Sequence, residues 1–214
     1  MNFPTDKRMD FVVVVDVTEG NPNGDPMRNN TPRTDPYDGH GLITDVCIKR
    51  KVRDYLTDEG QEMLITREPV AINDLLCQVA KTCDPPETKG KKDGGKKGKL
   101  GQAQGEVRAV AVCKRFIDAR LFGAMAETGD CPAGRIRGPL QLSMGRSLHP
   151  VRISKHQVTR IAVTDDKELE KPGTMSDEHG RQIVRYAAYR MVGTYSPRMG
   201  AKTGVSADDL NLFF

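Results

Sequence analysis

Three stretches of the chain carry side chains suited to binding a polyanion. The first is a long loop rich in Asn, Gly and Pro, the second is a basic segment just after it, and the third lies near residue 145. Amides, hydroxyls, cationic groups and free backbone N–H groups are the groups that contact phosphate oxygens. The residues concerned are Asn21, Asn23, Gly24, Lys49, Arg50, Arg53, Gln141, Ser143 and Arg146. Their types predict contacts with the backbone of a nucleic acid.

Common catalytic motifs are missing from the sequence, which contains no GxSxG, HExxH, DFG or HRD. Each of the four histidines, His40, His149, His156 and His179, reads by itself as structural or solvated. In a metal-independent ribonuclease, His156 beside Lys155 would be the best candidate for acid–base catalysis. We therefore expect no catalytic residue, with such a ribonuclease as the alternative.

Two patterns that suggest a cofactor fail on chemical grounds. Residues 90–97 have the spacing of a phosphate-binding P-loop, but Lys97 stands where Ser or Thr should bind magnesium, and no apolar strand precedes them. The five cysteines contain no CxxC pair and lie far from the histidines in sequence, which argues against zinc. Their odd number predicts reduced thiols in a cytoplasmic protein. We expect neither a metal nor a cofactor.

The charge of the chain is concentrated in one segment. The 214 residues carry a formal net charge of +4, and residues 87–99 alone hold six lysines against Glu87 and Asp93. No stretch is long and apolar enough to span a membrane, and the N-terminus lacks the apolar core of a signal peptide. We therefore expect a cytoplasmic protein with no membrane partner.

Hydrophobic patterns and capping residues predict the order of elements. Residues 11–15 form an unbroken apolar run, typical of a strand covered on both faces. The loop that follows, up to residue 42, contains prolines and Asn-Gly and predicts no regular structure. Thr44 or Asp45 then starts a helix. We expect helices at residues 44–57, 70–81 and 102–116, and strands at residues 117–123, 135–148, 158–164 and 182–195.

This order of elements predicts an α+β fold of the ferredoxin-like type, the plan of RNA-recognition domains. The chain ends in a short helix that Ser206 and Asp209 are expected to cap. Tyr186 and Tyr189 do not match the aromatic pair on which such domains stack bases. We therefore expect the protein to follow the nucleic-acid backbone rather than to read bases.

Five motifs, taken together and in this order, resemble one protein family. They are NPNGDP at 21–26, DPxxGHGLxTDVCxKRK at 35–51, DxRxFG at 118–123, GPxQxS at 138–143 and TRxAVT at 159–164. The chain resembles the crRNA-binding backbone subunit of the CRISPR Cascade complex, subtype I-C, in the RAMP superfamily. The resemblance covers nearly the whole chain, and the motifs are specific jointly rather than singly.

The resemblance implies a hand-like fold in a single domain spanning residues 1–214. A modified RNA-recognition palm would comprise residues 8–58, 115–148 and 182–214. A helical fingers insertion would occupy about 59–114, and a β-hairpin thumb about 149–181. Family members continue beyond the final helix, so the chain is expected to be short at its C-terminus.

The resemblance also implies partners and contacts. Copies without catalytic activity would assemble head to tail along one crRNA and present it for pairing with target DNA. The large and small Cascade subunits and the repeat-RNA-processing subunit would be further partners. Arg33 and Lys51 would join the RNA-facing residues named above, and His156 and Arg160 would be thumb contacts. The lysines of the fingers either touch target DNA or lie in a solvated loop, and these are Lys91, Lys92, Lys96 and Lys97.

Three functions remain open on the sequence. The first is a filament-forming RNA-binding subunit. The second is an endoribonuclease of the same superfamily that processes the repeat RNA. The third is a binding module that no longer assembles because of its short C-terminus.

Overall fold

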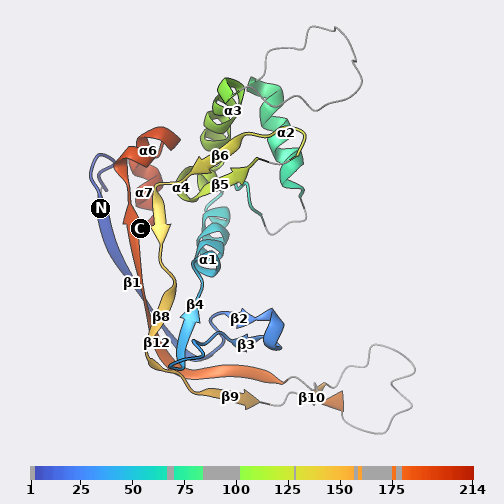
Figure 1. Cartoon of the computed structure of the whole chain (residues 1–214), viewed down its shortest axis with the longest axis vertical. Coiled ribbons are helices and arrows are strands. Elements are labelled where there is room, and N and C mark those ends of the chain that lie inside the picture. Colours follow the sequence, from blue (N-terminus) through green and yellow to red (C-terminus); the bar gives the residue numbers. More distant parts are fainter. Residues whose placement is uncertain are drawn as a thin grey trace. The chain divides into compact units, whose positions relative to one another are not determined.

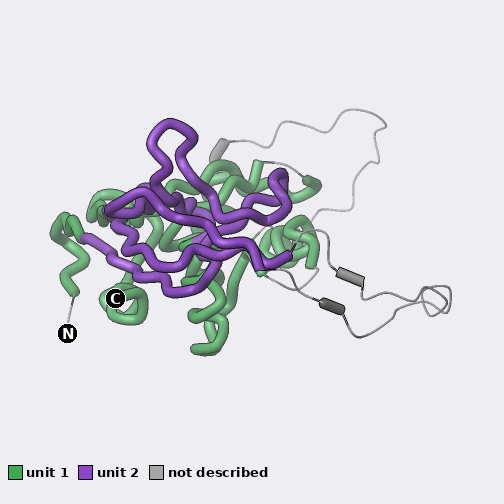
Figure 2. Tube along the Cα trace, turned by 90° about the horizontal axis from the view of Figure 1, so that it is seen from below, with its two compact units in different colours: residues 1–11, 48–141, 193–214 green, residues 12–47, 142–192 purple. Residues whose placement is uncertain are grey.

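The computed structural model describes residues 3–66, 70–83, 102–127, 129–156, 159–160, 175–176 and 180–214, in two compact units (Figure 2). Unit 1 comprises residues 1–11, 48–141 and 193–214, and unit 2 comprises residues 12–47 and 142–192. Two long strands, β1 (Met9–Gly20) and β12 (Arg181–Tyr195), each pass from one unit into the other along the chain.

Unit 1 is rich in helices (Figure 1). They are α1 (Asp45–Asp58, in unit 1 from residue 48), α2 (Ile72–Cys83), α3 (Gln102–Arg115), α4 (Ile117–Phe122), α6 (Pro197–Thr203) and α7 (Ala207–Phe213). The hairpin of β5 (Gly123–Ala126) and β6 (Gly134–Arg137) lies beside α3. The three helices predicted at 44–57, 70–81 and 102–116 are confirmed to within two residues at each end.

Two hydrophobic clusters hold unit 1 together. One joins α2 to α3 and to the β5–β6 hairpin through residues such as Leu76, Val112 and Phe116. The other gathers α1, α4 and the C-terminal segment around Leu121 and Tyr195. Burial of this apolar area, at about 25 cal/mol per Å², is the main stabilising term.

The prediction of a strand at residues 117–123 is wrong, because this stretch forms the helix α4. Five of its six residues are buried, including Asp118. The carboxylate of Asp118 accepts hydrogen bonds from the backbone N–H groups of Leu64 (2.8 Å) and Ile65 (3.2 Å). Alternation of polar and apolar residues indicates a strand only when one face is exposed to solvent. This segment is almost entirely buried, so its alternation does not distinguish a strand from a helix.

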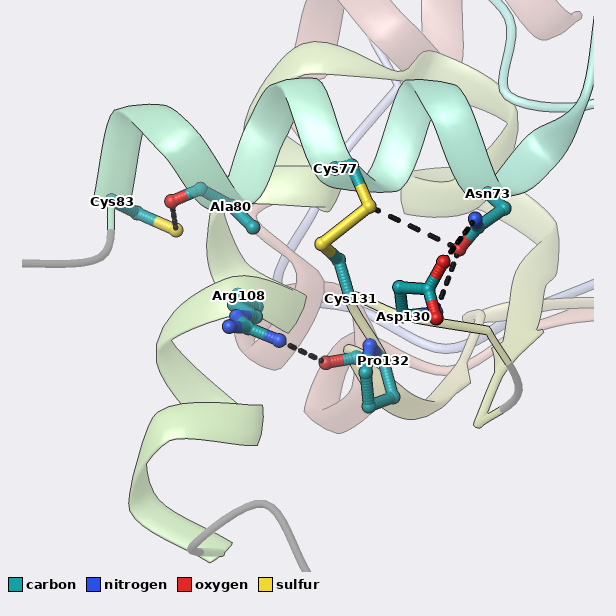
Figure 3. Close-up of a disulfide and its surroundings, with 8 residues drawn as sticks. All are labelled: Asn73, Cys77, Ala80, Cys83, Arg108, Asp130, Cys131 and Pro132. Atoms are coloured by element: carbon teal, nitrogen blue, oxygen red, sulfur yellow. Dashed lines mark hydrogen bonds between the residues drawn. A yellow bond between two sulfur atoms is a disulfide. The ribbon is translucent and has the colours of Figure 1, made fainter. Parts of the chain in front are cut away.

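The prediction of five reduced cysteines is also wrong for one pair. Cys77 on α2 and Cys131, in the connection between β5 and β6, form a disulfide with a Cα–Cα distance of 5.1 Å (Figure 3). Beside it, the side chain of Asn73 accepts a hydrogen bond from the backbone N–H of Asp130. The remaining cysteines, Cys47, Cys83 and Cys113, are not part of this disulfide, and Cys83 Sγ donates to the carbonyl of Ala80. Burial raises the pKa of the Cys113 thiol to about 11.

Unit 2 is built on an antiparallel sheet. The strand order β1-β12-β8-β4 includes β8 (Gly145–Pro150) and β4 (His40–Ile43), and β7 (Leu140–Leu142) and β9 (Ile153–His156) also pair with β12. The predicted strand at 182–195 is confirmed as β12. Its buried side chains Ala187, Tyr189 and Met191 alternate with more exposed ones, so one face of this strand is open in unit 2.

The expectation that residues 11–15 are covered on both faces is wrong. Val12 and Val14 of β1 are 59% and 62% exposed, while Val13 and Val15 are partly buried. Because every residue of the run is apolar, the residue types alone do not distinguish the open face from the covered one.

The loop predicted to lack regular structure contains three short strands. β2 (Gly24–Asp25) pairs with β3 (Thr31–Pro32) across a 3-10 turn, Pro26–Arg28, and β4 follows. Asn29 and Asn30 close this small hairpin with positive φ angles of 50° and 56°, a conformation that Asn adopts more readily than most residues. Local turn chemistry thus orders the loop despite its two prolines.

The strand predicted at 135–148 is divided into β6, β7 and β8. β6 pairs with β5 in one small sheet, whereas β7 pairs with β12 in another. At the first break, a Cβ on Gly138 would overlap the backbone of Phe122 and Gly123, so the close approach there requires glycine. Of the strand predicted at 158–164, the described part is β10 (Thr159–Arg160), which pairs with β11 (Met175–Ser176).

Both predicted helix caps are confirmed. Thr44 Oγ1 accepts a hydrogen bond from the N–H of Cys47 at the start of α1. Ser206 and Asp209 form a reciprocal capping box at the start of α7. None of the described helices combines the length and the hydrophobicity that a bilayer crossing requires.

Candidate nucleic-acid interface

The asparagines of the first loop hold the loop together. Asn23 Oδ1 accepts hydrogen bonds from the backbone N–H and the hydroxyl of Thr44, both at 3.0 Å. Asn21 donates from Nδ2 to the carbonyl of Asn30 at 2.6 Å. A Cβ on Gly24 would overlap the side chain of Asn30. These three residues therefore shape the β2–β3 hairpin and the start of α1, and Asn21 Nδ2 and Asn23 Oδ1 are used within unit 2.

Arg33 is the cation of this loop that was predicted to face RNA, and the exposed Arg28 is a second cation there. Its side chain is 34% exposed, and Nη2 lies 3.6 Å from Asp25 Oδ1. It lines a small hollow of about 200 Å³ in unit 2 with Arg28 and Thr31. Arg33 remains available to an anion because this ion pair is long.

The basic residues of α1 differ in exposure. Lys51 is exposed, Lys49 is half-buried, and Arg50 is 41% exposed with its Nε 3.4 Å from Asp54 Oδ1 one turn later. Arg53 was expected on the exposed side of the helix, and this is wrong. Its side chain is 8% exposed, and Nε donates to Asp118 Oδ2 at 2.9 Å. Arg53 therefore forms a buried ion pair within unit 1 and is not exposed for RNA binding.

Arg146 on β8 binds two carboxylates of the chain itself. Its Nη1 donates to Asp35 Oδ2 at 2.8 Å, and its Nη2 pairs with Asp38. The hydrogen bond from Arg146 is the main cause that lowers the pKa of Asp35 below its usual 3.8. The pKa of Asp38 is also lowered, mainly by the backbone N–H of His40. Both carboxylates are therefore charged near neutral pH, and they hold the guanidinium of Arg146 against the 35–40 turn.

The two polar residues predicted beside Arg146 also have partners within the chain. Ser143 Oγ accepts a hydrogen bond from the N–H of Val192 at 2.8 Å. Gln141, which belongs to unit 1, donates from Nε2 to the carbonyl of Gly138 at 2.9 Å and remains exposed. Ser143 thus extends the pairing of β12, and Gln141 supports the turn before β7.

The predicted thumb contacts lie in two different sheets, His156 in β9 of the sheet of unit 2 and Arg160 in the separate two-stranded sheet of β10 and β11. His156 is exposed at the end of β9, where it pairs in register with Arg181 of β12. Arg160 lies in β10. The four lysines predicted to approach DNA, Lys91, Lys92, Lys96 and Lys97, lie outside the described residues.

Two exposed residues of β12 were not among the predicted site residues: Arg190 was not singled out, and Tyr186 was considered only as part of an aromatic pair and rejected. Arg190 lies directly opposite Arg146 in the antiparallel pairing of β12 with β8. Tyr186 is 54% exposed, and its ring faces that of His149 at 6.4 Å between centroids and 29° between planes. The alternation of residues 186, 188, 190 and 192 could have placed both on the open face. Tyr189, in contrast, is fully buried, and burial raises the pKa of its hydroxyl.

Comparison with known proteins supplies the family. The model of the family described as CRISPR-associated protein Cas7 matches residues 7–214. A Haloferax volcanii protein named CRISPR-associated protein Cas7 is 43% identical over 60 residues, which are 28% of this chain and 18% of that protein. The chain therefore matches less than a fifth of that relative's length.

Among solved structures, the fold resembles a chain titled CRISPR RNA-guided surveillance complex, pre-nicking. The TM-score is 0.54 at 13% identity, and the match covers 96% of this chain and 69% of that one. A second surveillance-complex chain gives a TM-score of 0.47 at 13% identity and covers 97% of this chain and 60% of that one. The family match extends over almost the entire sequence, and we conclude that the chain belongs to the Cas7 family of CRISPR-associated proteins.

Proposed function

We propose that this chain is a non-catalytic backbone subunit of a Cascade-type surveillance complex of subtype I-C, acting in the cytoplasm. Copies assemble head to tail along one crRNA and present it for pairing with invading target DNA. The observation that carries the proposal is the family match over residues 7–214, which includes all the described elements from β1 to α7. The motifs at 21–26 and 35–51, which suggest subtype I-C, lie within it.

We propose two RNA-binding patches, one described on each unit. Lys49, Arg50 and Lys51 of α1 are exposed or half-buried, and on unit 2 Arg33 is available beside the β2–β3 hairpin. Phosphate contacts of this kind supply most of the affinity for a backbone, and they make it depend on salt. Arg53 is left out because its guanidinium is buried against Asp118.

The remaining roles in this proposal follow the resemblance. The hairpin of β9 and β12 would form part of the thumb, with His156 and Arg160 as its RNA contacts. The palm would take residues 8–58, 115–148 and 182–214, and the fingers 59–114. The large, small and repeat-processing subunits would be neighbours, and Lys91, Lys92, Lys96 and Lys97 would approach target DNA.

A charge-reversal variant tests the proposal. We expect Lys49→Glu/Arg50→Glu/Lys51→Glu to abolish multi-copy assembly on one guide-length RNA, measured as mass by light scattering on a sizing column. A matched control reverses three exposed cations of unit 1 outside the proposed surface, Lys114, Arg135 and Arg137. Assembly that survives the first variant, or that is lost equally in the control, would contradict the proposal.

An RNA-cleavage assay with the same protein preparation tests the alternative that the chain is an endoribonuclease. Incubation of repeat RNA with the unchanged protein and no metal should leave the RNA intact. Cleavage that disappears in His156→Ala would instead support the endoribonuclease, since His156 is exposed and could reach a substrate.

A further inference from the structure

The open face of unit 2's sheet contains a hollow of about 440 Å³. β8 and β12 form its floor, and the turn at residues 143–144 and His40 border it. It lies wholly within unit 2 and contains three cationic or ionisable side chains.

Most polar side chains of the hollow already have partners in the chain. Ser147 Oγ accepts from the N–H of Gly41 at 2.8 Å and donates to the carbonyl of His149 at 2.6 Å. Ser143 Oγ accepts from the N–H of Val192. These hydroxyls support the sheet, so a ligand would have to break sheet contacts to use them.

The two ionisable groups near β4 are also paired. Arg146 is held by Asp35 and Asp38, as described above. His40 Nδ1 lies 3.0 Å from Asp38 Oδ1. Two carboxylates thus offset the charge on this side of the hollow.

Arg190 is different. It is exposed, and among the described residues its guanidinium has no ion pair and no side-chain hydrogen bond. It faces Arg146 directly across the β8–β12 pair. Like charges in directly opposed positions destabilise a sheet, and the carboxylates on Arg146 reduce that repulsion. The hollow therefore offers one free guanidinium, which can bind a phosphate through two parallel hydrogen bonds.

Exposed apolar side chains line the same hollow as Arg190. Met144, Leu148 and Val192 are 51%, 61% and 41% exposed and line the same hollow. A nucleotide of a single strand has the matching chemistry, because its phosphate is anionic and the face of its base is apolar. A duplex does not, since its bases are stacked inside.

We propose that this hollow binds one nucleotide of single-stranded RNA, with Arg190 on the phosphate and the base against Leu148, Val192 and Met144. This inference rests on the proposed RNA-binding function and assigns it a specific site. It also replaces the prediction that Arg146 contacts the RNA backbone. Arg146 instead holds the 35–40 turn, and Arg190 binds the phosphate.

Short single-stranded RNA tests the site. We would measure binding of a fluorescent 12-nucleotide oligouridylate by anisotropy over a range of salt concentrations. For Arg190→Gln we expect affinity to fall roughly 3- to 10-fold and the negative slope of log K against log salt to become shallower by about 0.7, the value of one phosphate contact on a single strand. Arg135→Gln on β6 of unit 1, which is also exposed, should change neither quantity.

A second pair of variants separates the two arginines. Arg146→Gln should leave the salt slope unchanged, because its guanidinium binds carboxylates and not phosphate. Asp35→Asn/Asp38→Asn should release Arg146 and make the negative slope steeper by about 0.7. Thermal melting of each variant confirms that it is folded.

The outcomes distinguish this inference from the proposed function. If the unchanged chain binds RNA and Arg190→Gln binds it equally well with the same slope, the site is wrong and the function stands. A loss of slope in Arg146→Gln equal to that in Arg190→Gln would also overturn the site. If the unchanged chain binds no RNA, both fall. If Leu148→Gln alters self-association without RNA and leaves RNA affinity unchanged, the hollow belongs to a protein contact instead.

Discussion

In unit 1, Arg53 and Arg120 lie mostly buried and pair with Asp118 and Asp209, whereas in unit 2 Arg146 and Arg190 lie on an open sheet face. Arg120 donates to both oxygens of Asp209, at 2.6 and 2.8 Å, and to the carbonyl of Cys113. Unit 1 thus uses these arginines to join its helices. In unit 2, surface carboxylates hold Arg146, whereas the guanidinium of Arg190 has no ion pair among the described residues.

The difference predicts where substitutions affect stability and where they affect binding. Removing one partner of a buried pair strands the other charge in a medium of low polarity. Removing an exposed arginine strands nothing, so its effect should appear in ligand affinity rather than in folding.

The largest effect on stability is expected for Asp118→Ala. The carboxylate accepts from Arg53 and from the N–H groups of Leu64 and Ile65 in the interior of unit 1. We expect the free energy of unfolding, measured with urea, to fall by about 3–5 kcal/mol. Glu62→Ala is the control, because its 2.7 Å pair with Arg115 is exposed and should contribute about 1 kcal/mol or less.

A restoring variant makes this first test sharper. If the cost of Asp118→Ala comes from the stranded charge of Arg53, then Arg53→Met/Asp118→Leu should recover a large part of it. A double variant no more stable than Asp118→Ala would show that the backbone hydrogen bonds of Asp118 matter more than the ion pair.

The next effect concerns the disulfide of unit 1. Cys77 and Cys131 are 54 residues apart, and the chain-entropy estimate for a loop of that length is about 4 kcal/mol. We expect Cys77→Ala/Cys131→Ala, or reduction of the unchanged protein, to lower the free energy of unfolding by about 2–4 kcal/mol. Cys47→Ala, which removes a free thiol, is the control. Equal stability with and without a reductant would mean that the bond contributes nothing.

Features decided by neighbouring residues were predictable from the sequence. The caps at Thr44 and at Ser206 with Asp209 depend on residues within three positions, and both form. The predicted helices and the long strand β12 also form, because their hydrophobic patterns extend over many residues. The α+β class followed from their order.

Features decided by distant residues were not predictable. The disulfide joins positions 54 residues apart, and sequence spacing does not determine such a pairing. At the candidate site, the basic character of residues 49–51 and 146 was visible, but the partners of Arg146 lie 111 and 108 residues away. The burial of Arg53 was not predictable either, because its partner Asp118 lies 65 residues away in the sequence. Residue type identified the cations, and tertiary structure determined which of them are free.

The smallest predicted effect on stability concerns the carboxylate of Asp209, whose contribution to the free energy of unfolding is lost in acid. Burial alone would raise the pKa of Asp209, but the hydrogen bonds from Arg120 and from the N–H of Ser206 outweigh it, and the pKa is lowered from 3.8. A lowered pKa means that the charged form stabilises the folded state. This stabilisation is complete well above pH 3.8 and is lost as the pH falls through the folded-state pKa. The pKa of Asp35 in unit 2 is lowered as well, but Asp35 lies at the surface beside a partly exposed arginine.

We therefore expect Asp209→Asn to lower the free energy of unfolding at pH 7 by roughly 1.5–3 kcal/mol, the contribution of a hydrogen bond to a charged group. Its unfolding should also depend less on pH below about 4 than that of the unchanged protein. Asp35→Asn should change both quantities far less, because solvent and salt screen its pair with Arg146. Urea unfolding at pH 7 and pH 3 measures both variants. The opposite result would be a larger change in the pH dependence of unfolding for Asp35→Asn than for Asp209→Asn. It would mean that the ion pairs of Arg146 with Asp35 and Asp38 stabilise the fold of unit 2, and that of Arg146 and Arg190 only Arg190 lies outside the stabilising structure.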